Sequence, residues 1–88
     1  MTEPTEKERE ILESFEHFEN WDVHGSAFFR IRSGSRVVVR KHDGTWCIEG
    51  NHIHHANWVW DIKTLAEVRM HLRALSLLEG RLRLLRID

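Results

Sequence analysis

Asp43 and Gly44 stand between two segments in which apolar and polar residues alternate and β-branched or aromatic residues are frequent. An Asp-Gly pair in this setting predicts a two-residue β-hairpin loop, because a type I′ turn requires positive φ at both of its central residues. The length of the loop determines which residues face each other. The expected pairs are His42 with Thr45, Lys41 with Trp46, Arg40 with Cys47 and Val39 with Ile48.

A second turn, Ser33-Gly34-Ser35, precedes the first strand of that hairpin. A two-residue loop there would place Arg30 opposite Val39, and a slip of one residue turns every side chain of a strand to the other face. A three-residue loop keeps apolar residues together. The pairs that it predicts are Ile31 with Val37 and Phe29 with Val39. We therefore expect an antiparallel β-meander over residues 26–55.

The two turns give the middle strand the same sidedness, so the meander has one apolar face and one basic face. The apolar face forms the expected core. Its residues are Ala27, Phe29, Ile31, Val37, Val39, Trp46 and Ile48, with Lys41 at the rim. The opposite face, here called the arginine face, carries Phe28, Arg30, Arg32, Arg36, Val38 and Arg40, and continues through His42, Thr45, Cys47 and Glu49.

Gly50-Asn51 suits a further two-residue turn, of the type with glycine first. This hairpin would add a fourth strand that ends near His55 or Ala56, after which residues 56–60 lead into a helix. Its expected pairs are Ile48 with Ile53, Glu49 with His52 and Cys47 with His54.

An acidic helix is expected over residues 5–19, because Thr5 and Glu8 form a capping box before residues that recur at helical spacing. Those residues are Ile11, Leu12, Phe15 and Phe18. Residues 1–22 hold eight acidic and two basic residues, a balance of −6, and the rest holds six acidic and eleven basic, a balance of +5. The acidic surface is either solvated, or lies near the arginine face, or mimics a polyanion for a partner.

A second helix is expected over residues 64–79, with Thr64 and Glu67 as its capping box. One apolar stripe would cover the sheet. It consists of Leu65, Val68, Leu72, Leu75 and Leu78. A second stripe, Ala66, Met70, Ala74 and Leu77, would receive the acidic helix. If the acidic helix does not cover this stripe, a homodimer surface is expected there, formed by Met70, Ala74 and Leu77.

Residues 81–88 alternate like an edge strand, and Leu78, Leu82 and Leu85 also continue the helical spacing. Because Gly80 is a natural residue to end a helix, we favour the strand. The predicted fold is therefore α+β: a helix, a three- or four-stranded antiparallel meander, a helix packed on the sheet, and a possible final edge strand.

The length of 88 residues and the single cysteine predict one domain without an internal disulfide. No apolar run reaches the length of a membrane span, which predicts a cytoplasmic protein. The sequence lacks a phosphate-binding glycine loop, a zinc-protease motif and a nucleophile elbow, so we expect no enzyme.

A zinc site is the least favoured of the sites that the sequence suggests. The expected register brings four potential ligands to adjacent strands of one face, where cross-strand neighbours lie close enough to share a tetrahedral ion. They are His42, Cys47, His52 and His54. The spacing matches no zinc-finger pattern, and surface histidines are the simpler interpretation, so no cofactor is expected.

The arginine face predicts a small binding module that acts as an adaptor or stoichiometric inhibitor, of a type often carried by phages and other mobile elements. Arginine and tryptophan are enriched where interfaces carry most energy, and the chain has ten arginines and four tryptophans. We expect a protein partner with an acidic surface. The alternative is single-stranded nucleic acid, with phosphates on the arginines and a base stacked on Phe28.

Overall fold

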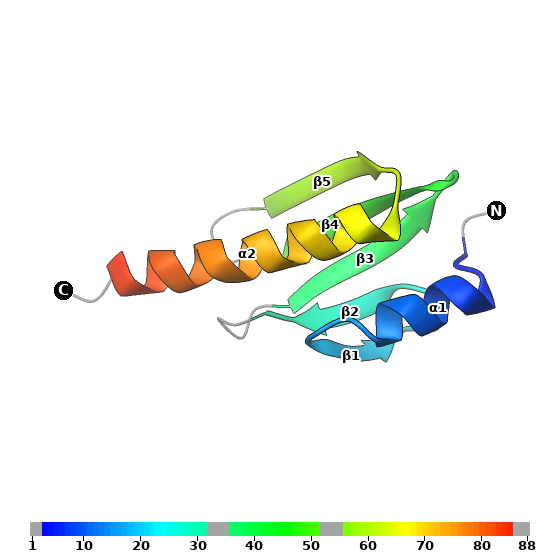
Figure 1. Cartoon of the computed structure of the whole chain (residues 1–88), viewed down its shortest axis with the longest axis horizontal. Coiled ribbons are helices and arrows are strands. Elements are labelled where there is room, and N and C mark those ends of the chain that lie inside the picture. The colour runs from blue at the N-terminus through cyan, green and yellow to red at the C-terminus, as the bar shows by residue number, and fades with distance from the viewer. Residues whose placement is uncertain (1–2, 32–35, 52–55, 86–88) are drawn as a thin grey trace.

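The protein is an α+β structure in which a five-stranded antiparallel sheet carries two helices (Figure 1). The computed structural model describes residues 3–31, 36–51 and 56–85. Along the chain the elements are α1 (Glu6–Glu13), β1 (Phe18–Trp21), β2 (Ala27–Arg30), β3 (Arg36–His42), β4 (Thr45–Asn51), β5 (Ala56–Ile62) and α2 (Leu65–Leu85). The strands lie in the order β1-β2-β3-β4-β5, so each pairs with its neighbours in sequence. The fold class is confirmed, with more strands than the sequence predicted.

Both helices pack on the same face of the sheet, and one core lies between the two layers (Figure 1). The buried residues of this core are Leu12, Ala27, Phe29, Ile31, Val37, Val39, Trp46, Ile48, Ile62, Val68 and Leu72. All seven residues expected on the apolar face are among them. The other sheet face, which includes Arg30, Arg36 and Arg40, is covered by neither α1 nor α2 (Figure 1). Among the described helices, none is long and apolar enough to cross a membrane.

The hairpin of β3 and β4 has the predicted register, with Val39 opposite Ile48 and Arg40 opposite Cys47. At the turn, φ is 48° at Asp43 and 82° at Gly44, so both residues have the positive φ that a type I′ turn requires. Local chemistry alone therefore set this pairing.

Replacing Gly44 with alanine should destabilise the protein by about 1–2 kcal/mol, because an L-residue with a side chain is strained at this φ. A Cβ at Gly44 would meet no atom within 4 Å, so the loss would come from the backbone conformation rather than a clash. Urea unfolding measures the change. The matched control is Asp43→Gly, which removes a side chain from the other left-handed position and should change stability by less than about 0.5 kcal/mol.

The register between β2 and β3 differs from the prediction by two residues. Phe29 lies opposite Val37 rather than Val39, and Arg30 lies opposite Arg36. The loop is thus longer than three residues, and Ser33-Gly34-Ser35 lies outside the described residues. Because side chains alternate with a period of two, a shift of two leaves each side chain on its expected face.

The predicted turn at Gly50-Asn51 is wrong. Strand β4 continues through Asn51, and β5 pairs with it through residues 56–62, which were expected to end the sheet and lead into a helix. Ile48 therefore faces Val59, not Ile53, and Glu49 faces Trp58, not His52. Trp60 and Asp61 together oppose Cys47 in a β-bulge, with φ of 58° at Asp61.

Helix α1 is shorter than predicted, since it ends at Glu13 with Ser14 as its C-cap. The Thr5–Glu8 capping box is confirmed, with backbone-to-side-chain distances of 2.8 and 3.2 Å. Phe15 and Phe18 pack against the core as expected, but from the turn and from β1 rather than from the helix.

Helix α2 is longer than predicted and runs through Gly80 to Leu85, so the edge strand expected over residues 81–88 is wrong for residues 81–85, and residues 86–88 lie outside the described residues. The side chains of α2 are described as far as Leu75. Val68 and Leu72 are buried against the sheet, which confirms the predicted covering stripe over this part. The helix projects beyond the end of the sheet (Figure 1).

Helix α1 does not cover the second stripe of α2. Met70 is 68% exposed, and Ala66 and Ala74 are exposed as well. The side chain of Leu77 lies outside the described residues. The homodimer surface proposed for this stripe therefore has two exposed members, Met70 and Ala74, and stays a prediction.

Candidate functional site

The arginine face is a feature of the folded protein. Strands β2 and β3 alternate so that Arg30, Arg36 and Arg40 leave the sheet on the side opposite the core, each with about half of its side chain exposed. Phe28 and Val38 are half-buried between them and lie opposite each other. Arg32 lies outside the described residues.

Glu19 pairs with two of these arginines. Its carboxylate lies 3.0 Å from Arg30 Nε and 3.4 Å from Arg36 Nε. The hydrogen bond from Arg30 holds the pKa of Glu19 below its ordinary value. Glu19 occupies a bulge in β1, between Phe18 opposite Phe29 and Asn20 opposite Phe28, and this extra residue places it beside the arginines.

The third arginine has its own carboxylate. Arg40 Nη1 lies 3.3 Å from an oxygen of Glu49 on the adjacent strand. Arg36 also stacks its guanidinium carbon 5.4 Å from the ring centroid of Phe28. Exposed ion pairs of this kind contribute little stability, and here they place a carboxylate next to each of the three guanidinium groups.

The acidic helix itself does not lie near the arginine face. Helix α1 packs on the core side, where Glu8 binds Lys41 Nζ at 2.7 Å and Glu13 accepts a 2.7 Å hydrogen bond from Trp21 Nε1. These contacts anchor the helix to the sheet. Of the acidic residues assigned to that helix, Glu19 alone is seen on the arginine face, and it belongs to β1.

Trp60 enlarges the arginine face toward β5, and the sequence did not predict it. Val59 packs against the core, so its neighbour Trp60 projects to the opposite side, where it is 52% exposed. Cys47, opposite the bulge, is only 3% exposed, and burial raises the pKa of its thiol. A buried thiol with a raised pKa is a poor nucleophile and a poor metal ligand.

The geometry behind the zinc prediction is wrong, because the β4–β5 register does not place Cys47 opposite His54. His52 and His54 lie outside the described residues. His42 forms a 3.4 Å contact with Asp43 at the turn. Within residues 3–31, 36–51 and 56–85, no group of three or more potential ligands could hold a metal ion.

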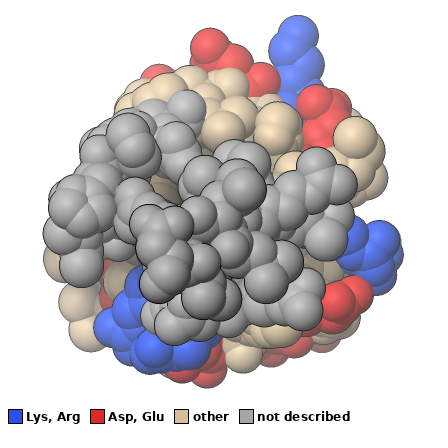
Figure 2. Space-filling view, turned by 90° about the vertical axis from the view of Figure 1, so that its left-hand side faces the viewer, with Lys and Arg blue, Asp and Glu red and all other residues tan. Residues whose placement is uncertain are grey.

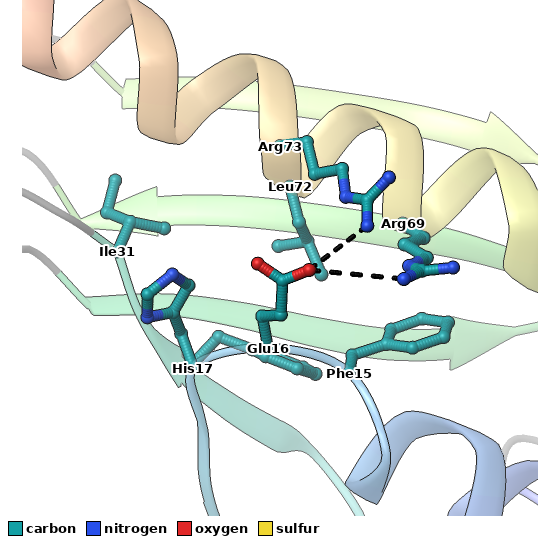
Figure 3. A pocket seen from close by; sticks show the side chains of 8 residues that line it. Phe15, Glu16, His17, Ile31, Arg69, Leu72 and Arg73 are labelled. Carbon is teal, nitrogen blue, oxygen red and sulfur yellow. Dashed lines mark hydrogen bonds and ion pairs between the residues drawn. The ribbon is translucent and has the colours of Figure 1, made fainter.

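A pocket of about 350 Å³ lies on the helical side of the sheet (Figure 3). It forms between the turn after α1, the end of β2 and the middle of α2. Phe15, Glu16, His17, Phe29, Ile31, Arg69, Leu72 and Arg73 line it. This pocket was not predictable from the sequence, because its walls come from three segments far apart in the chain.

Charged side chains of opposite sign lie side by side around one end of the molecule (Figure 2). In the end-on view of Figure 2, the visible Lys and Arg side chains have Asp and Glu side chains beside them. The same holds on the arginine face, where Glu19 and Glu49 accompany the three described arginines.

No protein-family model matches the chain, and neither the curated proteins nor the solved structures give a match. The geometry of the described residues is therefore the basis on which a function can be proposed.

Proposed function

We propose that the protein is a small non-catalytic binding module, an adaptor or stoichiometric inhibitor, that binds an acidic protein surface through the arginine face. One observation carries this proposal. A sheet face left open by both described helices presents three half-exposed arginines and the half-buried Phe28 on β2 and β3, and the half-exposed Trp60 on β5. The site of action that we propose is the cytoplasm.

The residue types suit a protein interface. Arginine and tryptophan are the residues whose truncation most often costs an interface more than about 2 kcal/mol. Carboxylates hold Arg30, Arg36 and Arg40 in position, so less side-chain entropy is lost on binding than for unrestrained arginines. A surface that carries charges of both signs can select a partner by the positions of those charges.

Single-stranded nucleic acid is the alternative partner of the same face. Phe28 and Trp60 could stack bases, and the guanidinium groups could bind phosphates. Glu19 and Glu49 weaken this alternative, because each places a negative charge among the arginines that would contact the phosphate backbone.

The double substitution Arg36→Glu and Arg40→Glu should lower affinity for the protein partner by at least about 100-fold, since two interface arginines at more than about 1.4 kcal/mol each are reversed in charge. The partner is captured from the native host with the tagged protein, and its affinity is then measured by calorimetry with purified components.

The matched control is Lys7→Glu with Lys63→Glu, which makes the same change in net charge at exposed positions of α1 and of the segment before α2. It should bind as the native chain does. Equal affinity of the two double variants would show that the arginine face is not the binding surface. Retardation of generic single-stranded DNA or RNA in a gel at low salt would favour the alternative, and its absence at micromolar protein would eliminate it.

A further inference from the structure

The pocket on the helical side combines an apolar floor with a charged rim. Phe29, Ile31 and Leu72 form buried parts of its floor, and Phe15 adds a half-buried aromatic ring. Its volume of about 350 Å³ is near the lower end of the range of ligand pockets, roughly 300–1,000 Å³. The pocket therefore suits a small apolar molecule, and it lies on the opposite side of the sheet from the arginine face.

The rim has more positive than negative charge. Arg69 and Arg73, one turn apart on α2, both face Glu16 (Figure 3). Arg73 Nη2 binds Glu16 Oε1 at 3.0 Å, and this hydrogen bond lowers the pKa of Glu16, which stays ionised at neutral pH. One carboxylate thus faces two guanidinium groups.

Arg69 keeps donors that Glu16 does not use. Its Nη2 atom lies 3.9 Å from Glu16 Oε1, beyond hydrogen-bond distance. Its guanidinium carbon lies 6.0 Å from the ring centroid of Phe15, so the cation lies over one aromatic wall of the pocket. A guanidinium has five N–H donors and matches a carboxylate with two parallel hydrogen bonds.

We propose that this pocket binds a small monocarboxylate with an apolar body, such as a medium-chain fatty acid. The carboxylate binds Arg69 at the rim, and the apolar body lies against Phe15 and Leu72. Glu16 orients the two arginines and at the same time competes with the ligand for them. This site is independent of the arginine face and of the function proposed for it.

Decanoate is the probe for this site. Titrated into the full chain and followed by ¹⁵N–¹H NMR, it should bind saturably and shift amides around Glu16 and Arg69. Decylamine has the same chain length with a positive head group and should not bind there. Decanol, which is neutral, should bind at least about fivefold more weakly, since a charge-assisted hydrogen bond contributes more than a neutral one.

Two substitutions on the rim should change decanoate affinity in opposite directions. Arg69→Met should lower it by about fivefold or more, because the unused donors are lost while an apolar stem of similar length remains. Glu16→Gln should raise it by about two- to fivefold, because it removes the competing charge. A merely structural role for Glu16 predicts no such gain. Lys63→Met, which removes an exposed cation elsewhere, should leave the affinity unchanged.

Each variant is checked for an unchanged thermal midpoint before titration, and Arg73→Met, which should also weaken binding, replaces Arg69→Met if that variant fails the check. Absence of saturable binding at millimolar decanoate would overturn the proposal. So would equal binding of decanol and decanoate, tighter binding of decylamine, or shifts centred on the arginine face.

Discussion

Replacing Val39 with aspartate should leave the chain largely unfolded at neutral pH, whereas the same substitution at the neighbouring Val38 should leave a folded protein. Val39 is 1% exposed and points into the core, and Val38 is half-buried on the arginine face. An aspartate at position 39 would either keep its charge in an apolar site or take up a proton at neutral pH. Each alternative has a free-energy cost that lowers the stability of the folded state. That cost is comparable to the total stability of a domain of this size, roughly 4–13 kcal/mol at about 0.05–0.15 kcal/mol per residue.

At Val38 the aspartate would stand between Arg36 and Arg40 on its own strand, with Glu49 opposite. This substitution should lower the free energy of unfolding by about 1–2 kcal/mol, because less apolar surface is buried and aspartate has a low strand propensity. Far-UV circular dichroism and urea unfolding of both variants measure the contrast. Equal tolerance of the two substitutions, or greater damage at Val38, would show that the assigned sidedness of β3 is incorrect.

This sidedness was predictable because it depends on local signals. The Asp43-Gly44 turn fixed the hairpin of β3 and β4, and both turn residues have the expected positive φ. The other turn was assigned the wrong length, but the error of two residues left every side chain on the correct face. The face on which a strand side chain lies can therefore be predicted more reliably than the length of the loop that joins two strands.

The edge strands β1 and β5 could not be predicted in the same way, because each contains a bulge. In β1 the extra residue is Glu19, and in β5 Trp60 and Asp61 share one partner. A bulge interrupts the alternation of side chains, so the period of two that identifies a strand is lost over such short segments. Phe18 also continued the helical spacing of α1, which extended the predicted helix too far.

The two glycines near element ends were misleading for a related reason. Gly50 lies within β4, where pairing with β3 and with β5 continues across it, and Gly80 lies within α2, which continues to Leu85. Glycine permits a turn or a helix end without requiring one. At Gly50, local propensity favoured a turn, and the strand pairing on both sides decided against it.

The candidate site was predicted in part. Alternation identified Arg30, Arg36 and Arg40 as neighbours on one face, since they belong to two adjacent strands. Glu19 was missed because its strand was taken for a helix, and Trp60 because its strand was expected to end earlier. The first omission follows from the bulge in β1, and the second from the wrongly predicted turn at Gly50-Asn51. The charge balance of the face could therefore be known only from the structure.

Truncation of Leu12 to alanine should destabilise the protein by about 2–5 kcal/mol, the usual range for a fully buried leucine. Leu12 is 0% exposed and brings α1 into the common core. A helix of eight residues is too short to be stable by itself in water, so α1 depends on this contact and on its polar anchors at Lys41 and Trp21. Hydrogen exchange of the α1 amides and urea unfolding measure the loss.

The neighbouring Ile11 provides the matched control, because it belongs to the same helix and is 37% exposed. Ile11→Ala should lower the free energy of unfolding by less than about 1.5 kcal/mol, since it removes less buried area and leaves no enclosed cavity. If the Leu12 variant alone loses protection in α1 while the sheet amides stay protected, the helix is a separately opening unit that Leu12 holds closed. Similar small losses for both variants would mean that the polar anchors, rather than the buried leucine, hold α1 on the sheet.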